Sequence, residues 1–406
     1  DTAGDGSQGS PWRTIQHAVD TVSSGDTINV AAGIYDENID VNKYVSIIGA
    51  GSGTDGTIIQ NTVAPIQIDS TYKPVVMLHA SGVADNPVLL KDLRITPHQD
   101  QVGTSHMLPG IYVPDGSSVS YVKLDNVKVI GTSSSGTPER GLIVHAGGSL
   151  NYLVVDNCEF SNCSHGWQIN NTSGSGTTVE HVEVSNTTFD NNSIKGFYAE
   201  KLSDATFSNV IVTNNGDITR YDNANNAGID INLKFGDYQN LEFNNLTVTG
   251  NGIGSANGVG FTVKARGTGA DSYSSDPATL DGVTVNGGTF TGNEAGIRFG
   301  EPGKDNTSPT NITVTNANIF NNTQFGLANA LEGVSVDATN NWWGDASGPQ
   351  DDAGVINGSG DKISTNVDAD PWANGLRVLS GDSQTGTVGT ALANPFVAQL
   401  KNSDGT

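Results

Sequence analysis

The 406-residue sequence is short of cysteine, of cations and of long apolar runs, and each shortage excludes a class of protein. Two cysteines do not make a disulfide scaffold. No segment approaches the roughly 18 apolar residues of a membrane-spanning helix. Only 19 Lys and Arg stand against 43 Asp and Glu, which gives a net charge of −24. A surface this negative repels nucleic acid and anionic membranes, so we expect neither a nucleic-acid partner nor membrane insertion.

Hydrophobic residues are also scarce, whereas glycine is abundant. Only 35% of the residues are hydrophobic and 15% are charged, while 51 are glycine. A compact α/β enzyme has a larger apolar fraction, and helices disfavour glycine. A regular Val/Ile/Phe alternation argues against disorder and favours a β-rich repeat. The acidic composition predicts an extracellular or cell-surface protein, and a chain that begins at Asp1 without a signal peptide is expected to be a processed product.

One repeat explains most of the chain. Each copy has an apolar-x-apolar strand, a polar turn, an Asn, a Gly and a second apolar-x-apolar strand. The clearest copies are residues 154–170, 182–200, 241–251, 283–300 and 312–330. Strands this short, joined by turns of one or two residues, suit neither hairpins nor helices. The repeat predicts an all-β fold, a right-handed parallel β-helix of about 11 coils. We expect an N-terminal cap over 1–26, the β-helix over 27–375 and a separate segment over 376–406.

Asparagine and glycine mark two successive corners of the repeat. The asparagines are Asn192, Asn215, Asn251, Asn293 and Asn322, and Cys163 takes the same place one coil earlier. Coils of a parallel β-helix stack about 4.8 Å apart, so each side-chain amide can bond the next, and we expect a buried ladder. The glycines are Gly166, Gly196, Gly228, Gly296 and Gly326. Here we expect a tight bend or a positive φ.

The two ends of a solenoid need covering, because open strand edges invite aggregation. Residues 11–25 contain the best amphipathic helix of the sequence, and we expect a capping helix over 12–23 with Ile15 and Val19 buried. At the opposite end, Trp342 and Trp343 stand where the repeats stop. We expect one of these tryptophans to seal the core.

The opening of the chain resembles that of many β-helix proteins. The resemblance covers residues 14–59 and includes the cap helix, a G-x-Y-x-E turn at Gly33, Tyr35 and Glu37, and the strand SIIGAG. It implies the pectate-lyase and pectinesterase-like superfamily of right-handed parallel β-helices. The acidic and arginine motifs that pectinesterases carry later in the chain are not found here, so pectinesterase activity is not expected.

The last residues, 376–406, resemble the first strands of a bacterial immunoglobulin-like domain, and the sequence stops partway through them. The alternative is a linker. The resemblance implies a longer natural polypeptide of the cell-surface type, with self-association through this segment.

Two columns of outward side chains follow from the corner glycines, because residues alternate inward and outward along a strand. The first column is Gln168, Tyr198, Asp230, Thr262 and Arg298. The second, two residues further on, is His145, Asn170, Glu200, Asn232 and Lys264, and the same strands continue to Lys234 and Arg266. Cations therefore gather beside two carboxylates on adjacent coils. The partner expected for such a groove is a polysaccharide or a cell-surface glycan.

The first chemistry that these columns suggest is β-elimination on a uronic-acid polysaccharide. The C5 proton becomes acidic once the neighbouring carboxylate is neutralised, which Ca²⁺ held by hard oxygens can do. Glu200, Asp230 and Asn232 offer those oxygens, and no other cofactor is expected. The set is similar in residue type to that of β-helix lyases acting on alginate or chondroitin, which pair Lys and Arg beside acidic Ca²⁺ ligands.

Among the cations, Lys264 is predicted to be the base, since nearby positive charge lowers the pKa of a lysine. Arg298 or Arg266 would stabilise the developing charge. The residues expected to bind substrate are Tyr198, Lys234, Gln168 and Asn170.

Two other functions stay open. Glu200 and Asp230 lie about 8 Å apart by strand geometry, within the range of an inverting glycoside hydrolase. The remaining interpretation is a non-catalytic surface adhesin, sheath or filament protein. In that protein the same charges pair across strands, with Lys264 bound to Glu200 and no groove.

Overall fold

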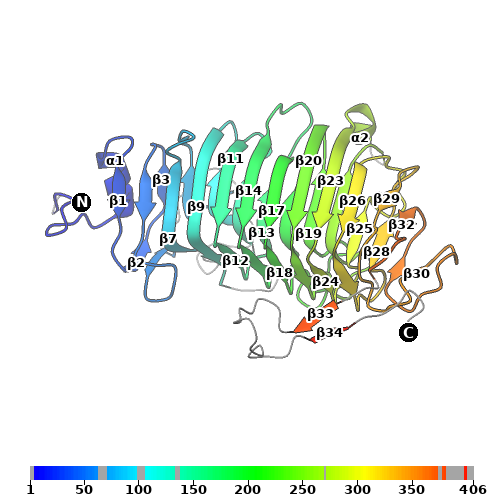
Figure 1. Ribbon diagram of the computed structural model, residues 1–406. Helices are drawn as coiled ribbons and strands as arrows, with labels where there is room; N and C mark the ends of the chain where they lie inside the picture. Colours follow the sequence, from blue (N-terminus) through cyan, green and yellow to red (C-terminus); the bar gives the residue numbers. More distant parts are fainter. Residues whose placement is uncertain are drawn as a thin grey trace.

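The chain winds into a right-handed parallel β-helix in the computed structural model, as predicted (Figure 1). The structure describes residues 4–62, 71–97, 106–132, 138–268, 271–373, 377–380 and 397–399. Successive coils add parallel strands to a twelve-stranded sheet and a twenty-stranded sheet.

The twelve-stranded sheet takes one strand from each coil except the last, which contributes two, and it carries the candidate site. Its strands are β3 (Ile39–Val41), β6 (Val76–Leu78), β8 (Leu108–Val113), β10 (Glu139–Val144), β13 (His165–Ile169), β16 (Lys195–Ala199), β19 (Ala227–Leu233), β22 (Val259–Ala265), β25 (Ile297–Phe299), β28 (Leu327–Asn329), β31 (Lys362–Ile363) and β30 (Gln350–Asp351).

The twenty-stranded sheet forms the other walls of the coils. Its strands are β1 (Thr27–Asn29), β2 (Gly33–Asp36), β4 (Ser46–Ile48), β5 (Thr57–Gln60), β7 (Val88–Thr96), β9 (Ser118–Ile130), β11 (Ser149–Asp156), β12 (Glu159–Ser161), β14 (Val179–Ser185), β15 (Thr188–Asp190), β17 (Ser203–Ser208), β18 (Ile211–Thr213), β20 (Gly236–Asn244), β21 (Thr247–Thr249), β23 (Ala278–Asn286), β24 (Thr289–Thr291), β26 (Thr310–Thr315), β27 (Asn318–Phe320), β29 (Val336–Asp337) and β32 (Val367–Asp368).

The core is a pile of apolar rungs, one from each coil. Phe160, Phe189, Val212, Val248 and Phe290 are in register on five successive coils and are fully buried. The rings of Phe160 and Phe189 stack with centroids 5.5 Å apart. Since each short strand buries only alternate residues, a chain with few hydrophobic residues still fills the interior.

The asparagine ladder is confirmed. The side-chain amide of Asn192 donates to Oδ1 of Asn215 at 2.8 Å, and the same bond repeats down the column. The later rungs are Asn215 to Asn251 at 2.9 Å, Asn251 to Asn293 at 2.9 Å, and Asn293 to Asn322 at 3.0 Å. Cys163 occupies the preceding place, and its backbone N–H donates to Asn192. The ladder ends at Asp361, which accepts from the half-buried Asn322.

Glycine is required at these corners for a reason other than a positive φ. None of the five predicted glycines has a positive φ. A Cβ on Gly196 would lie 2.8 Å from the carbonyl oxygen of Gly228 on the next coil, so a side chain is excluded by contact between backbones. The left-handed corners are instead occupied by asparagines such as Asn157 and Asn186, with φ of 54° and 49°.

Both end caps are confirmed. Helix α1 (Ile15–Thr21) is shorter than predicted, and it buries Ile15 and Val19. The carboxylate of Glu37 accepts from the backbone N–H groups of Ile15 and Gln16 at 2.8 and 2.9 Å, so this residue of the G-x-Y-x-E turn caps the helix. At the far end Trp343 is fully buried.

The described C-terminal residues, the cysteines and the helices add three further observations. Strands β33 (Arg377–Ser380) and β34 (Val397–Gln399) form an antiparallel pair, and the rest of the predicted immunoglobulin-like segment lies outside the described residues. Cys158 and Cys163 are buried free thiols. The described part of the chain holds no helix long and apolar enough to cross a membrane.

Candidate active site

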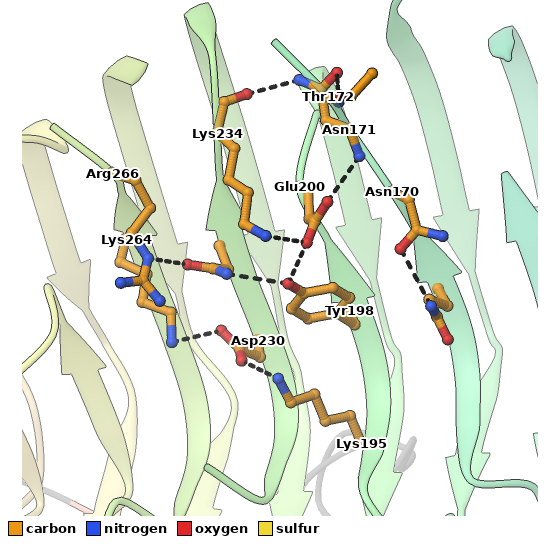
Figure 2. Close-up of polar contacts among 12 residues, drawn as sticks. Asn170, Asn171, Thr172, Lys195, Tyr198, Glu200, Asp230, Lys234, Lys264 and Arg266 are labelled. Carbon is orange, nitrogen blue, oxygen red and sulfur yellow. Dashed lines mark hydrogen bonds and ion pairs between the residues drawn. The ribbon is translucent and has the colours of Figure 1, made fainter. Parts of the chain in front are cut away.

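The first predicted column is confirmed in the twelve-stranded sheet. Tyr198 is in register with Gln168 and Asp230, and Thr262 is in register with Asp230 and Arg298. The second column is also present, since Asn232 lies opposite Lys264. Their inward neighbours along the strands fill the core, so both columns face outward (Figure 2).

Asp230 lies between two lysines. Its Oδ2 is 2.5 Å from Nζ of Lys195, and its Oδ1 is 3.1 Å from Nζ of Lys264 (Figure 2). Burial alone would raise the pKa of Asp230, but the charges and hydrogen bonds of the two lysines outweigh it and hold the pKa well below its usual range. Asp230 is therefore an ionised acceptor and not a proton donor.

Glu200 has partners on both carboxylate oxygens. Its Oε1 receives the ammonium group of Lys234 and the hydroxyl of Tyr198, the latter at 2.6 Å. Its Oε2 accepts from the backbone N–H of Asn171 at 2.8 Å. The side chain is buried, so this set of donors fixes its position (Figure 2).

A hydrogen-bonded chain crosses three strands and ends at this carboxylate. Arg266 donates from Nε to Oδ1 of Asn232 at 2.8 Å, and Asn232 donates from Nδ2 to the Tyr198 hydroxyl at 3.0 Å. Burial and the charge of Glu200 raise the pKa of Tyr198 well above its ordinary value. The phenol is therefore protonated and points its hydrogen at Glu200.

The calcium site predicted at Glu200, Asp230 and Asn232 does not fit this arrangement. Lysines, a phenol and a backbone N–H take the oxygens of both carboxylates, and Arg266 takes the amide oxygen of Asn232. Within the described residues no three His, Cys, Asp or Glu side chains are placed to hold a metal ion. We derive no step through calcium.

Lys264, which we predicted as the base, is not exposed as its outward position led us to expect. Lys264 is 3% exposed and pairs with Asp230, and not with Glu200 as the charge-ladder alternative required. Burial lowers its pKa to about 8, and Asp230 opposes that shift. Its amine is thus turned to a neighbouring coil and away from solvent.

The guanidinium groups of both predicted arginines contact other groups of the protein. Arg298 is 6% exposed and donates from Nη1 to the carbonyl oxygen of Asn257 at 3.1 Å, while its Nε has no hydrogen-bond partner among the described residues. Arg266 pairs with Glu301 and lies 5.6 Å from the ring of Tyr273 in α2 (Asp271–Ser275).

Sequence reasoning missed a third outward column. Arg140, His165 and Lys195 are in register on β10, β13 and β16, each directly before a corner glycine. Alternation along the strand did not reveal them, because the residues two places further on, Leu142, Trp167 and Phe197, face the core. Arg140 donates to Gln168 at 2.8 Å, and Gln168 donates to Asn170 at 3.1 Å, so both predicted binding residues lie beside this column.

His165 adds a neutral group to the site. Burial and the charges of Arg140 and Lys195 hold the pKa of His165 well below its ordinary value, so the imidazole is uncharged. Its ring centroid is 6.1 Å from that of Tyr198, and Nζ of Lys195 is 4.2 Å from the Tyr198 ring. His165 and Tyr198 are both half-buried, unlike Asp230 and Lys264.

Cations outnumber carboxylates among the described residues of this cluster. Its six cations are Arg140, Lys195, Lys234, Lys264, Arg266 and Arg298, against the three carboxylates of Glu200, Asp230 and Glu301. This face therefore contrasts with the rest of a chain whose net charge is −24. Such a face attracts anions locally.

Comparison with known proteins adds little beyond the fold. Residues 1–62 match the family model described as a protein of unknown function, DUF1565. No curated protein sequence matches the chain.

Several solved β-helix structures are similar to it. The A-module of mannuronan C-5 epimerase AlgE4 from Azotobacter vinelandii is 18% identical with a TM-score of 0.48, over 80% of this chain and 73% of that one. An alginate lyase from Paenibacillus is 12% identical with a TM-score of 0.43, over 87% and 96%. Pectate lyase Pel9A is 13% identical with a TM-score of 0.38, over 92% and 77%. At these values the likeness does not bear on the activity.

Proposed function

We propose that this outer face binds an acidic polysaccharide and cleaves it by β-elimination, outside the cell or at its surface. The observation that carries the proposal is the gathering of six cations on one face of a strongly acidic protein. A spacer has no need to gather six of its 19 cations at one place. A polymer of uronic acids supplies the matching negative charges.

The proton transfers are assigned to the two half-buried neutral groups. His165 is an uncharged imidazole, so it accepts the C5 proton of a bound uronate. The electrons form the C4–C5 double bond as the C4–O bond breaks, and the leaving oxygen takes the phenol proton of Tyr198. Lys264, buried against Asp230, positions that carboxylate and Lys195 beneath the pair. The leaving chain ends in a hydroxyl, and the other fragment carries an unsaturated uronate.

The hydrolase alternative has less support. An inverting glycosidase needs one carboxylic acid whose pKa is raised so that it can protonate the leaving group. Asp230 has a lowered pKa, and Glu200 receives a lysine, a phenol and a backbone N–H. Neither is arranged as an acid.

The non-catalytic surface module is the second candidate. The observation in its favour is that Asp230, Glu200 and Glu301 each form an ion pair with a lysine or arginine of the same face. Such pairs hold neighbouring coils together without a substrate.

The ultraviolet absorbance of the new C4–C5 double bond tests the proposal. The protein is incubated with alginate, pectate and glycosaminoglycans, with and without EDTA. We expect turnover on one of them, insensitive to EDTA, with a loss of about 10²-fold to 10⁴-fold in His165→Ala and in Tyr198→Phe. Circular dichroism checks that the variants are folded.

Two results separate the alternatives. If Lys264→Met abolishes turnover while His165→Ala retains it, the base is Lys264. A wild-type protein inert on every acidic polysaccharide would instead support the surface module.

A further inference from the structure

A concave surface lies on the twenty-stranded sheet, separate from the candidate active site. It is a groove of about 600 Å³ that crosses β9, β11, β14 and β17. One side is formed by Tyr121, Tyr152 and His181 on three successive coils. None of these residues belongs to the cluster of cations described above.

The three rings of this groove form a continuous stack. Tyr121 and Tyr152 lie with centroids 4.5 Å apart and planes 10° apart, and Tyr152 and His181 lie 4.5 Å and 22° apart. Tyr152 is nevertheless 42% exposed. Since its neighbours cover both faces of the ring, the exposed part is the ring edge with its hydroxyl. The stack therefore presents apolar edges and hydroxyl groups along the groove.

The backbone of these three aromatic residues has an unfavourable, left-handed conformation. Tyr121, Tyr152 and His181 have φ of 55°, 55° and 56°, in the left-handed region that bulky residues rarely adopt. On the next four coils the same corner holds residues that tolerate this region, namely Asp204, Asn240, Gly282 and Asn311. At this corner the aromatics are thus found on the coils of the groove, while Phe235, with φ of 57°, is a left-handed aromatic at another corner. An outlier of this kind is expected where a side chain serves a function.

We propose that this groove is a second binding site, which takes a neutral oligosaccharide. The many hydroxyls of a sugar match the exposed phenol groups and Thr206, and its C–H groups pack against the ring edges and Val154. The charges in the groove are Lys123 against Glu183 and Asp204, so it does not attract an anionic polymer.

The size of the groove also favours a small glycan. Its volume falls within the roughly 300–1,000 Å³ of small-molecule sites. Its lining of twelve residues is below the roughly 20–30 residues a side of a stable protein–protein interface. A few sugar units, and not a protein, therefore fit this surface.

The test uses Tyr152→Asn, because asparagine occupies the same left-handed corner at Asn240 and should preserve the fold. The matched control is Tyr221→Asn, which removes another exposed tyrosine, 41% exposed, from outside the groove. Binding of cellohexaose, mannohexaose and xylohexaose is measured by saturation-transfer NMR and calorimetry, with hexaguluronate as the anionic comparison. Thermal unfolding confirms that both variants are folded.

We expect the wild type to bind at least one neutral hexasaccharide, Tyr152→Asn to weaken that binding tenfold or more, and Tyr221→Asn to leave it unchanged. His165→Ala should also leave it unchanged, which separates this site from the proposed lyase site. The inference is overturned if no neutral probe binds, if only hexaguluronate binds, or if Tyr152→Asn binds like the wild type. A concentration-dependent dimer that Tyr152→Asn abolishes would overturn it too, because the occupant would then be a second copy.

Discussion

Removing one central rung of the asparagine ladder should destabilise the protein more than the loss of a single hydrogen bond. In Asn251→Ala the backbone N–H and the side-chain amide of Asn215 both lose their acceptor, each a bond of 2.9 Å. The carbonyl of Val212 also loses its donor. These groups are buried, and each costs about 1–3 kcal/mol when left unpaired. Taking the low end for each, we expect a loss of about 3–4 kcal/mol in the free energy of unfolding.

The matched control is Asn322→Ala at the end of the same ladder. In Asn322→Ala the backbone N–H and the side-chain amide of Asn293 lose their acceptor, but the removed side chain is half-buried, so water enters the vacated space and bonds them, and about 1 kcal/mol is expected. Urea unfolding followed by circular dichroism measures both values. Equal losses in the two variants, or a loss below about 1 kcal/mol in Asn251→Ala, would show that burial of the ladder is not what makes it stabilising.

Three further outcomes follow from buried contacts. Lys264→Met should lower the free energy of unfolding, measured by thermal unfolding, by about 1–3 kcal/mol, because Asp230 loses one of its two cations. A loss under about 0.5 kcal/mol would contradict a stabilising buried pair. Gly196→Ala should cost about 1–3 kcal/mol because its Cβ meets the next coil at 2.8 Å, whereas Gly9→Ala, with nothing within 4 Å, should be neutral. Burial lowers the pKa of Lys201 to about 8 from 10.5, so between these pH values the folded chain has released a proton that the unfolded chain still holds. The contribution of Lys201 to the free energy of unfolding should therefore rise with pH across that window. Urea unfolding from pH 7 to 10 should show this rise in the wild type and not in Lys201→Met.

The fold could be predicted because a solenoid repeats its physical constraints in every coil. The Asn column appeared in the sequence as a ladder, and its bonds between coils have the predicted partners. The corner glycines were found at the right positions for an incomplete reason. A positive φ is a property of one residue, whereas the contact that excludes a Cβ at Gly196 involves the next coil, whose spacing a single repeat does not reveal.

The candidate site was predicted less completely, and the reason is again contact between coils. The register of Tyr198, Asp230 and Thr262 followed from the glycine corners. The pairing of cations with carboxylates could not be predicted, because long lysine side chains reach across strands. Asp230 pairs with Lys195, which belongs to the third column that the sequence analysis missed. Burial of the outward face was not predicted either.

Each outward column changes character along the rod, and this sets where a ligand can bind. The column of Tyr198 has a run of largely apolar residues on its earlier coils, in the register Asp40, Met77, Tyr112, Ile143, Gln168, Tyr198, Asp230, Thr262 and Arg298. Apart from Asp40, which is bonded to His79, the charges of this column lie on its later coils, while the stacked Tyr121, Tyr152 and His181 lie on the twenty-stranded sheet. Because a positive cluster and a weakly acidic groove select ligands of different charge, an anionic chain and a neutral glycan should bind without competing.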